Sequence, residues 1–153
     1  MVLPFEAPLA SAELRWGRAV LWSTLHMIES VRLAKAAGKS PTEAGRDVGR
    51  LYADTWTTVD TPWRLTRAWM WNGMSDPNYV CDVQSASATL VKARCNRPWM
   101  ATVRENVQRT KVTIDDVEAY QLAMEQAVAE HVGMKWEVQV DGDHRLITVQ
   151  RQR

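Results

Sequence analysis

The sequence predicts an α+β fold in which two β-hairpins form one four-stranded antiparallel sheet, with helices packed across one face. Two observations lead to this prediction. Apolar residues recur at helical spacing in several segments, whereas two later segments alternate apolar and polar residues and turn back on themselves. A single hairpin is too small to bury its apolar side, so we expect the two to join. A chain of 153 residues is a common size for one domain, here 1–153.

Residues 1–10 contain two prolines and little periodicity, so they are predicted to form an extended arm. A long amphipathic helix is expected from Ser11 to about Ala37, where Gly38 supplies a left-handed stop. The expected buried stripe of this helix consists of Leu14, Leu21, Leu25 and Ile28.

A second helix is predicted by its N-terminal chemistry. Ser40 can cap it, Pro41 suits its first turn, and Glu43 completes a capping box. We expect it to run to about Thr57. Its expected buried face consists of Ala44, Val48, Leu51 and Thr55. A strip of small residues along it would let another helix approach closely: Gly45, Gly49 and Ala53.

A third, shorter helix is expected after Thr61 and Pro62, from Trp63 to about Asn72, with Gly73 closing it. Its aromatic content would also suit a strand. After a turn-rich stretch, Tyr79, Cys81 and Val83 alternate and residues 88–95 return as a partner strand, which predicts the first hairpin.

Two helices and the second hairpin complete the predicted order. Asn96 and Pro98 are typical of a cap and first turn, and this helix should extend to about Arg109. Thr113 starts another helix that reaches His131. The last hairpin consists of residues 134–140, an Asp141-Gly142 turn and residues 146–150.

Charge and composition exclude several classes of partner. The formal net charge is +1 and the basic residues are scattered, so we expect no nucleic-acid partner. The densest basic stretch is interpreted as a solvated edge and tail: Arg145, Arg151 and Arg153. The apolar runs are far shorter than the roughly 20 residues of a membrane span, so no membrane partner is expected.

The cysteines and the N-terminus bear on location. Two cysteines cannot form a disulfide framework, and charged residues interrupt the layout of a secretion signal. We therefore expect a soluble bacterial protein in the reducing cytoplasm. A homodimer stays open.

Eight tryptophans stand beside a single phenylalanine, and this favours a pocket walled by indole rings. The expected ligand is a flat aromatic or heterocyclic small molecule. The alternative is that most of these rings fill the core. The residues predicted to bind ligand are Trp22, Trp63, Trp69, Trp71, Trp99, Arg94 and Arg97.

Two groups of residues are candidates for catalysis. His26 shares a helix face with Trp22 and Glu29, so the carboxylate could orient the imidazole as a general base. The alternative is a surface pair without function. Cys95 precedes an expected helix start and lies between arginines, which would stabilise a thiolate. The alternative is a buried structural cysteine, and His144 is a second candidate base.

No metal or other cofactor is expected. A metal site would require three or more of the cysteine, histidine and carboxylate side chains to converge, yet no local Cys-x-x-Cys or His-Glu-x-x-His spacing is present. Phosphate-binding loops and the Gly-x-Ser-x-Gly elbow are absent as well.

The stretch from Tyr79 to Trp99, with Arg94-Cys95-Asn96-Arg97-Pro98-Trp99 at its end and helices and a hairpin after it, resembles the L-2-amino-thiazoline-4-carboxylic acid hydrolase family. That family is related in outline to the 4-vinyl reductase ligand-binding domains. Its members carry a cysteine-proline pair, whereas Asn96 and Arg97 separate Cys95 from Pro98 here. The family also has a cysteine in the last hairpin, at a position that falls near His144 in this sequence. The resemblance implies a helix-and-sheet cup around a small heterocycle or carboxylate, with hydrolysis of a C–N or C–S bond as one known outcome.

Three functions follow from these observations. The first is a small hydrolase-like enzyme of specialised metabolism that uses Cys95 as nucleophile or acid and His26 or His144 as base. The second is a non-catalytic small-molecule-binding or carrier module of the same fold. The third is an interaction protein that exposes its tryptophans to a partner.

Overall fold

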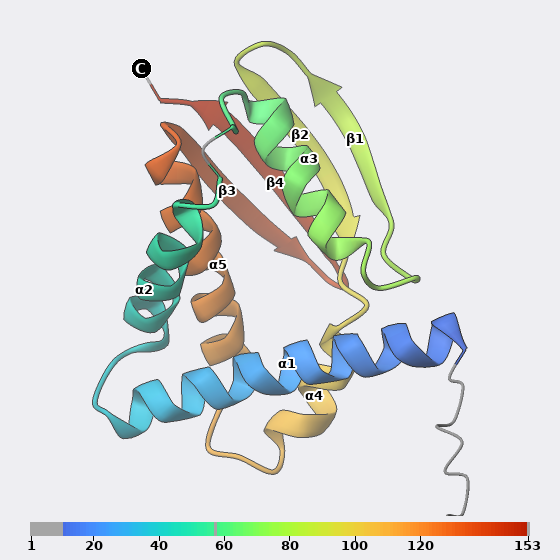
Figure 1. Cartoon of the computed structure of the whole chain (residues 1–153), viewed down its shortest axis with the longest axis vertical. Helices are drawn as coiled ribbons and strands as arrows, with labels where there is room; N and C mark the ends of the chain where they lie inside the picture. Colours follow the sequence, from blue (N-terminus) through green and yellow to red (C-terminus); the bar gives the residue numbers. More distant parts are fainter. Residues whose placement is uncertain (1–10, 57, 153) are drawn as a thin grey trace, which may run out of the picture.

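The computed structural model describes residues 11–56 and 58–152, so the predicted arm at 1–10 lies outside the described residues. It contains five helices and a four-stranded antiparallel sheet, which confirms the α+β class (Figure 1). The elements are α1 (Ala12–Ala36), α2 (Pro41–Ala53), α3 (Pro62–Gly73), β1 (Cys81–Ala86), β2 (Leu90–Asn96), α4 (Met100–Val107), α5 (Ile114–His131), β3 (Met134–Asp141) and β4 (His144–Arg151).

The two hairpins join through β2 and β4, giving the strand order β1-β2-β4-β3. Alternation along β4 turns Arg145, Ile147 and Val149 toward the helices, while the residues between them face away. At the tip of the second hairpin Gly142 has a φ of 56°, as the predicted Asp-Gly turn requires. The sheet therefore has one apolar, helix-covered face and one polar face.

Helices α3 and α5 cover the apolar face (Figure 1). Leu65 of α3 and Val128 of α5 are buried in one cluster with the inward residues of β2, β3 and β4. Helix α2 forms the next layer and packs along α5, where Gly45 and Gly49 lie against its backbone. The predicted small-residue strip is therefore a helix-helix contact.

A second core cluster joins α1 to α4 and the start of α5, and it corrects the stripe predicted for α1. Leu14 and Leu21 are exposed, because the N-terminal half of α1 extends past the body of the fold (Figure 1). The buried residues of α1 are Thr24, Ile28, Val31 and Ala34. The predicted period was right, but only its C-terminal half meets a partner.

Two other boundaries differ from the prediction. Helix α2 ends at Ala53 rather than near Thr57, and Leu51, predicted to be buried, is 72% exposed because the glycine strip faces α5 instead. Helix α4 begins at Met100 without a side-chain cap. The predicted cap, Asn96, is the last residue of β2, and its side chain forms hydrogen bonds with Val80 and Asn78 just before β1.

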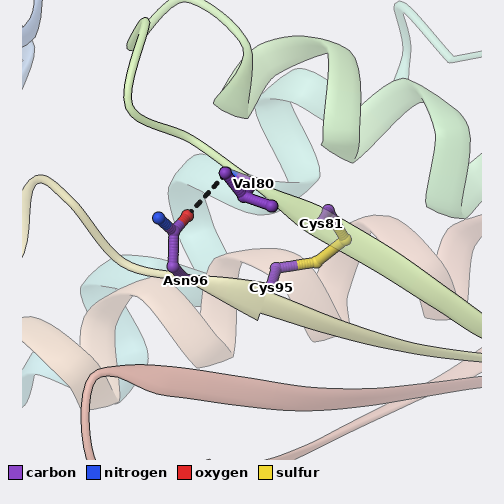
Figure 2. The surroundings of a disulfide bond; sticks show 4 residues. All are labelled: Val80, Cys81, Cys95 and Asn96. Atoms are coloured by element: carbon purple, nitrogen blue, oxygen red, sulfur yellow. Dashed lines mark hydrogen bonds between the residues drawn. A yellow bond between two sulfur atoms is a disulfide. The ribbon is translucent and has the colours of Figure 1, made fainter.

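Cys81 and Cys95 are directly opposite on β1 and β2 and form a disulfide (Figure 2). Asn96, the next residue, adds two hydrogen bonds at this end of the strand pair. Its Oδ1 accepts from the Val80 N–H at 2.7 Å, and its Nδ2 donates to the Asn78 carbonyl at 2.7 Å. This pairing differs from the free thiols expected for a reducing compartment. The disulfide links the edge strand β1 covalently to β2.

Replacing both cysteines with serine is expected to lower the free energy of unfolding by up to about 3 kcal/mol. The two cysteines are 14 positions apart in the sequence, and the bond between them restricts the unfolded chain by closing that loop. Urea denaturation of the variant and the wild type measures the difference. Alkylation of the denatured, unreduced wild type should add no mass. Two additions would mean that the thiols are free.

Candidate functional site

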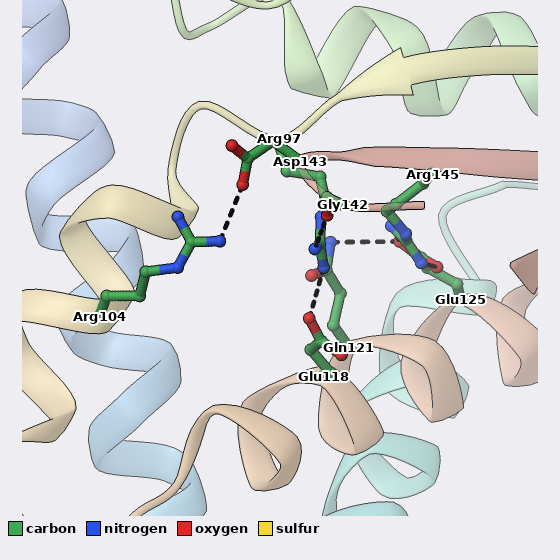
Figure 3. Close-up of polar contacts among 8 residues, drawn as sticks. All are labelled: Arg97, Arg104, Glu118, Gln121, Glu125, Gly142, Asp143 and Arg145. Carbon is green, nitrogen blue, oxygen red and sulfur yellow. Dashed lines mark hydrogen bonds and ion pairs between the residues drawn. The ribbon is translucent and has the colours of Figure 1, made fainter. Parts of the chain in front are cut away.

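A buried ion pair links α5 to β4 on the helix-covered face of the sheet (Figure 3). Arg145 NH1 donates to Glu125 Oε1 at 2.6 Å, and its NH2 pairs with Oε2. The indole N–H of Trp136 also donates to Oε2 at 3.0 Å, and Gln121 Nε2 donates to Oε1 at 3.2 Å. Glu125 is 2% exposed and Arg145 7% exposed, so each charge depends on the other for compensation.

Burial and this pair shift the pKa of two groups. Burial by itself lowers the pKa of the Arg145 guanidinium, but the Glu125 carboxylate outweighs it and raises that pKa above its ordinary value. Burial raises the pKa of the Tyr79 phenol to about 12; Arg145 opposes this shift and Glu125 adds to it. Both Tyr79 and Arg145 therefore keep their protons throughout the physiological range.

A second buried arginine lies next to the first. Arg97 follows β2, and its NH1 pairs with Glu118 of α5 while its NH2 donates to the Gly142 carbonyl at 2.7 Å (Figure 3). Its backbone N–H donates to the Asp143 carbonyl at 3.0 Å, which fixes it to the turn of the second hairpin. Its Nε is buried and has no acceptor among the described residues.

These arginines line a pocket of about 310 Å³ between α5 and β3, which is an edge strand of the sheet. The α5 side supplies carboxylates, an amide and a short apolar wall, and β3 supplies two valines. The lining residues are Arg97, Asp115, Glu118, Ala119, Gln121, Leu122, Val138, Val140 and Arg145. The site thus combines a charged floor with an apolar flank.

The tryptophans predicted to bind ligand do not line the pocket between α5 and β3. Trp22 and Trp71 are 58% and 67% exposed, and Trp63 is exposed as well. Trp69 packs in the core between Trp56 and Trp136, at ring-centroid distances of 5.1 and 5.9 Å. Most of these rings fill core space or face solvent.

Two of the three remaining residues predicted to bind ligand, Trp99 and Arg94, also lie outside the pocket. Trp99 is half-buried with its ring centroid 6.4 Å from that of Tyr79. Arg94 faces the opposite side of the sheet and pairs with Asp141 at 3.5 Å. Among the residues predicted to bind ligand, Arg97 is the one that lines the pocket.

The predicted catalytic residues do not converge. Cys95 is in the disulfide and has no thiol to ionise. His144 lies opposite Asn96, one position out of step with Cys95, so it belongs to the other face of the sheet. His26 is exposed on α1 and stacks on Trp22, and Glu29 binds Arg32 at 2.6 Å instead of the imidazole.

The periodicity of β4 and α5 by itself places the ion-paired residues on buried faces. Arg145 has the same parity in β4 as Ile147 and Val149, so alternation places it on the apolar face rather than on a solvated edge. Glu118 and Glu125 are seven residues apart in α5 and therefore share one side of the helix. A charge at a position that periodicity buries predicts a buried partner of opposite charge.

Residues 11–56 and 58–152 show neither a metal site nor a membrane span. In the described ranges, no three side chains of histidine, cysteine, aspartate or glutamate are grouped as a metal site would require. No helix in that part of the chain has the length and apolar character needed to cross a membrane.

No protein-family model matches this chain, and no curated protein matches it either. Two solved structures resemble it over 79% of its length and 68% of theirs: the Fe(II) unliganded H-NOX protein from K. algicida, with a TM-score of 0.43 and 9% identity, and a point mutant of that protein, with a TM-score of 0.45 and 10% identity. At this level of similarity they assign neither a ligand nor a function to the chain.

Proposed function

We propose that this protein is a small-molecule-binding module whose ligand occupies the pocket between α5 and β3. The observation that carries the proposal is a concave site floored by two buried, ion-paired arginines. Natural ligand pockets combine apolar walls with a few fixed polar groups, and 310 Å³ lies at the small end of their range, about 300–1,000 Å³. The ligand is therefore a small molecule rather than a chain.

The polar groups of this pocket are held in place before any ligand arrives. Arg145 is fixed by Glu125, and Arg97 is fixed by the Gly142 carbonyl and by its own backbone. Side chains that are already fixed lower the entropic cost of binding a ligand. Leu122 and Val138 offer an apolar flank for the body of an aromatic or heterocyclic ligand.

A hydrolase that uses Cys95, as the family resemblance implies, has less support. Its nucleophile would require reduction of the disulfide, and its candidate bases lie on α1 and on the other face of the sheet. The binding module requires no such change. The bacterial, cytoplasmic setting and a homodimer stay predictions.

A panel of small aromatic acids, amines and neutral compounds tests the proposal by NMR. The indole N–H of Trp136 is a suitable reporter, because it donates to Glu125, whose partner Arg145 lines the pocket. Its resonance is assigned by its loss in Trp136→Phe. At least one class of compound is expected to shift this resonance in a saturable way.

Ala119→Trp is expected to weaken binding by at least tenfold, since the indole would occupy the pocket that Ala119 lines. Titration of the Trp136 resonance measures the change. Ala101→Trp on the exposed surface of α4 is the control and should bind as the wild type does. No response to the whole panel, or equal binding by both variants, would contradict the proposal.

A further inference from the structure

We infer that the ligand of this pocket carries an oxyanion that binds Arg97 by replacing the carboxylate of Glu118. The inference rests on the proposed function and adds the chemical class of the ligand. Glu118 then acts as an internal substitute for that group, closing the site when it is empty.

The first support is the unfinished hydrogen bonding of Arg97. Its side chain is 5% exposed, yet its buried Nε has no acceptor in the described part of the chain. A guanidinium presents its N–H groups as a planar fork that suits two oxygens of one oxyanion. The present acceptors of Arg97 are one Glu118 oxygen, Oε1, and the Gly142 carbonyl, so no oxyanion occupies the fork with two oxygens and Nε is left over.

The second support is the difference between the two carboxylates. Glu125 accepts from Arg145, Trp136 and Gln121 and is almost fully buried, so it cannot leave without stranding a buried cation. Glu118 makes one such bond and its side chain is 30% exposed. Its carboxylate can turn into water, and the buried Arg97 that it leaves then needs another anion, so Glu118 is the partner that an incoming oxyanion can replace.

The third support is charge balance. The pocket lining holds two arginines and two acidic residues, Asp115 and Glu118, and the charge of Arg145 is already balanced by Glu125. An anion that entered while Glu118 stayed would add a third negative charge beside Asp115. If Glu118 leaves, Arg97 becomes an uncompensated buried cation, and an incoming oxyanion restores the balance. The exchange therefore conserves charge within the site.

The test uses four probes that share one ring: benzoate, phenylphosphonate, benzamide and benzylamine. Each is titrated by calorimetry into the wild type, Glu118→Gln and Asp115→Asn. Removing the internal competitor is expected to tighten benzoate or phenylphosphonate roughly tenfold in Glu118→Gln. The relative gain of the two shows whether the carboxylate or the phosphonate fits better.

Asp115→Asn is the matched control, because it removes a charge from the same lining at a residue that does not bind Arg97. Its effect through the electrostatic field alone should be about twofold and should vanish in 0.5 M salt, roughly where screening removes exposed interactions. The gain in Glu118→Gln should persist in that salt. Benzamide should change little in either variant.

Several results would overturn the inference. They are an equal gain in both variants, tighter binding of benzylamine than of benzoate by the wild type, and no binding of either anion by Glu118→Gln. If other compounds of the wider panel still shift the Trp136 resonance, only the oxyanion inference fails. If no compound does, the proposed function fails with it.

Discussion

Glu125→Gln is expected to lower the free energy of unfolding by about 3–5 kcal/mol, the usual cost of breaking a buried ion pair by removing one partner. The amide keeps the shape of the carboxylate but not its charge. Arg145, 7% exposed, would then lie in the core without a counter-charge, and the Trp136 indole would donate to a weaker acceptor. The change should appear as a lower urea midpoint with an unaltered slope.

Glu130→Gln is the control on the same helix. Glu130 also pairs with an arginine, Arg46, at 2.9 Å, but both side chains are well exposed. Exposed pairs contribute at most about 1 kcal/mol. A loss in Glu125→Gln no larger than in Glu130→Gln would mean that water reaches the Glu125 site.

The double variant Glu125→Leu, Arg145→Met separates the pair's own contribution from the cost of breaking it. Replacing a buried pair with apolar groups of similar volume is often neutral or stabilising. We expect the double variant to recover most of the stability that Glu125→Gln loses. It should also abolish ligand binding, since Arg145 lines the pocket, so the pair would be retained for binding rather than for stability.

Local chemistry made the element order predictable. The capping boxes at Ser40 and Thr113 form as their sequences indicate, because the cap and its partner are three residues apart and need no tertiary contact. The Asp141-Gly142 turn likewise fixes the second hairpin from two residues. These signals depend on residues that are neighbours in the chain.

Tertiary partners were less predictable. Periodicity identifies the stripe of α1 but not how much of it another element covers, and Leu14 and Leu21 remain in solvent. The predicted catalytic residues do not converge, for a related reason. Reactive residue types drew attention to Cys95 and His26, whereas the residues that converge are arginines and glutamates brought together from β4, α5 and the segment after β2.

Gly45→Ala is expected to destabilise the fold by about 3 kcal/mol, at the upper end of ordinary overpacking. A Cβ at this position would lie 2.1 Å from the carbonyl oxygen of Tyr120, which is backbone and cannot turn aside. Helices α2 and α5 would have to separate. Gly49→Ala should behave similarly, because its Cβ would lie 2.5 Å from the Met124 carbonyl oxygen.

Gly17→Ala is the matched control within a helix, since no described atom lies within 4 Å of a Cβ there. Without a clash, the better helix propensity of alanine should stabilise the protein by up to about 1 kcal/mol. Urea denaturation of the three variants measures their free energies of unfolding, which should fall for Gly45→Ala and Gly49→Ala and rise for Gly17→Ala. If Gly45→Ala were neutral, α2 would not pack this closely on α5.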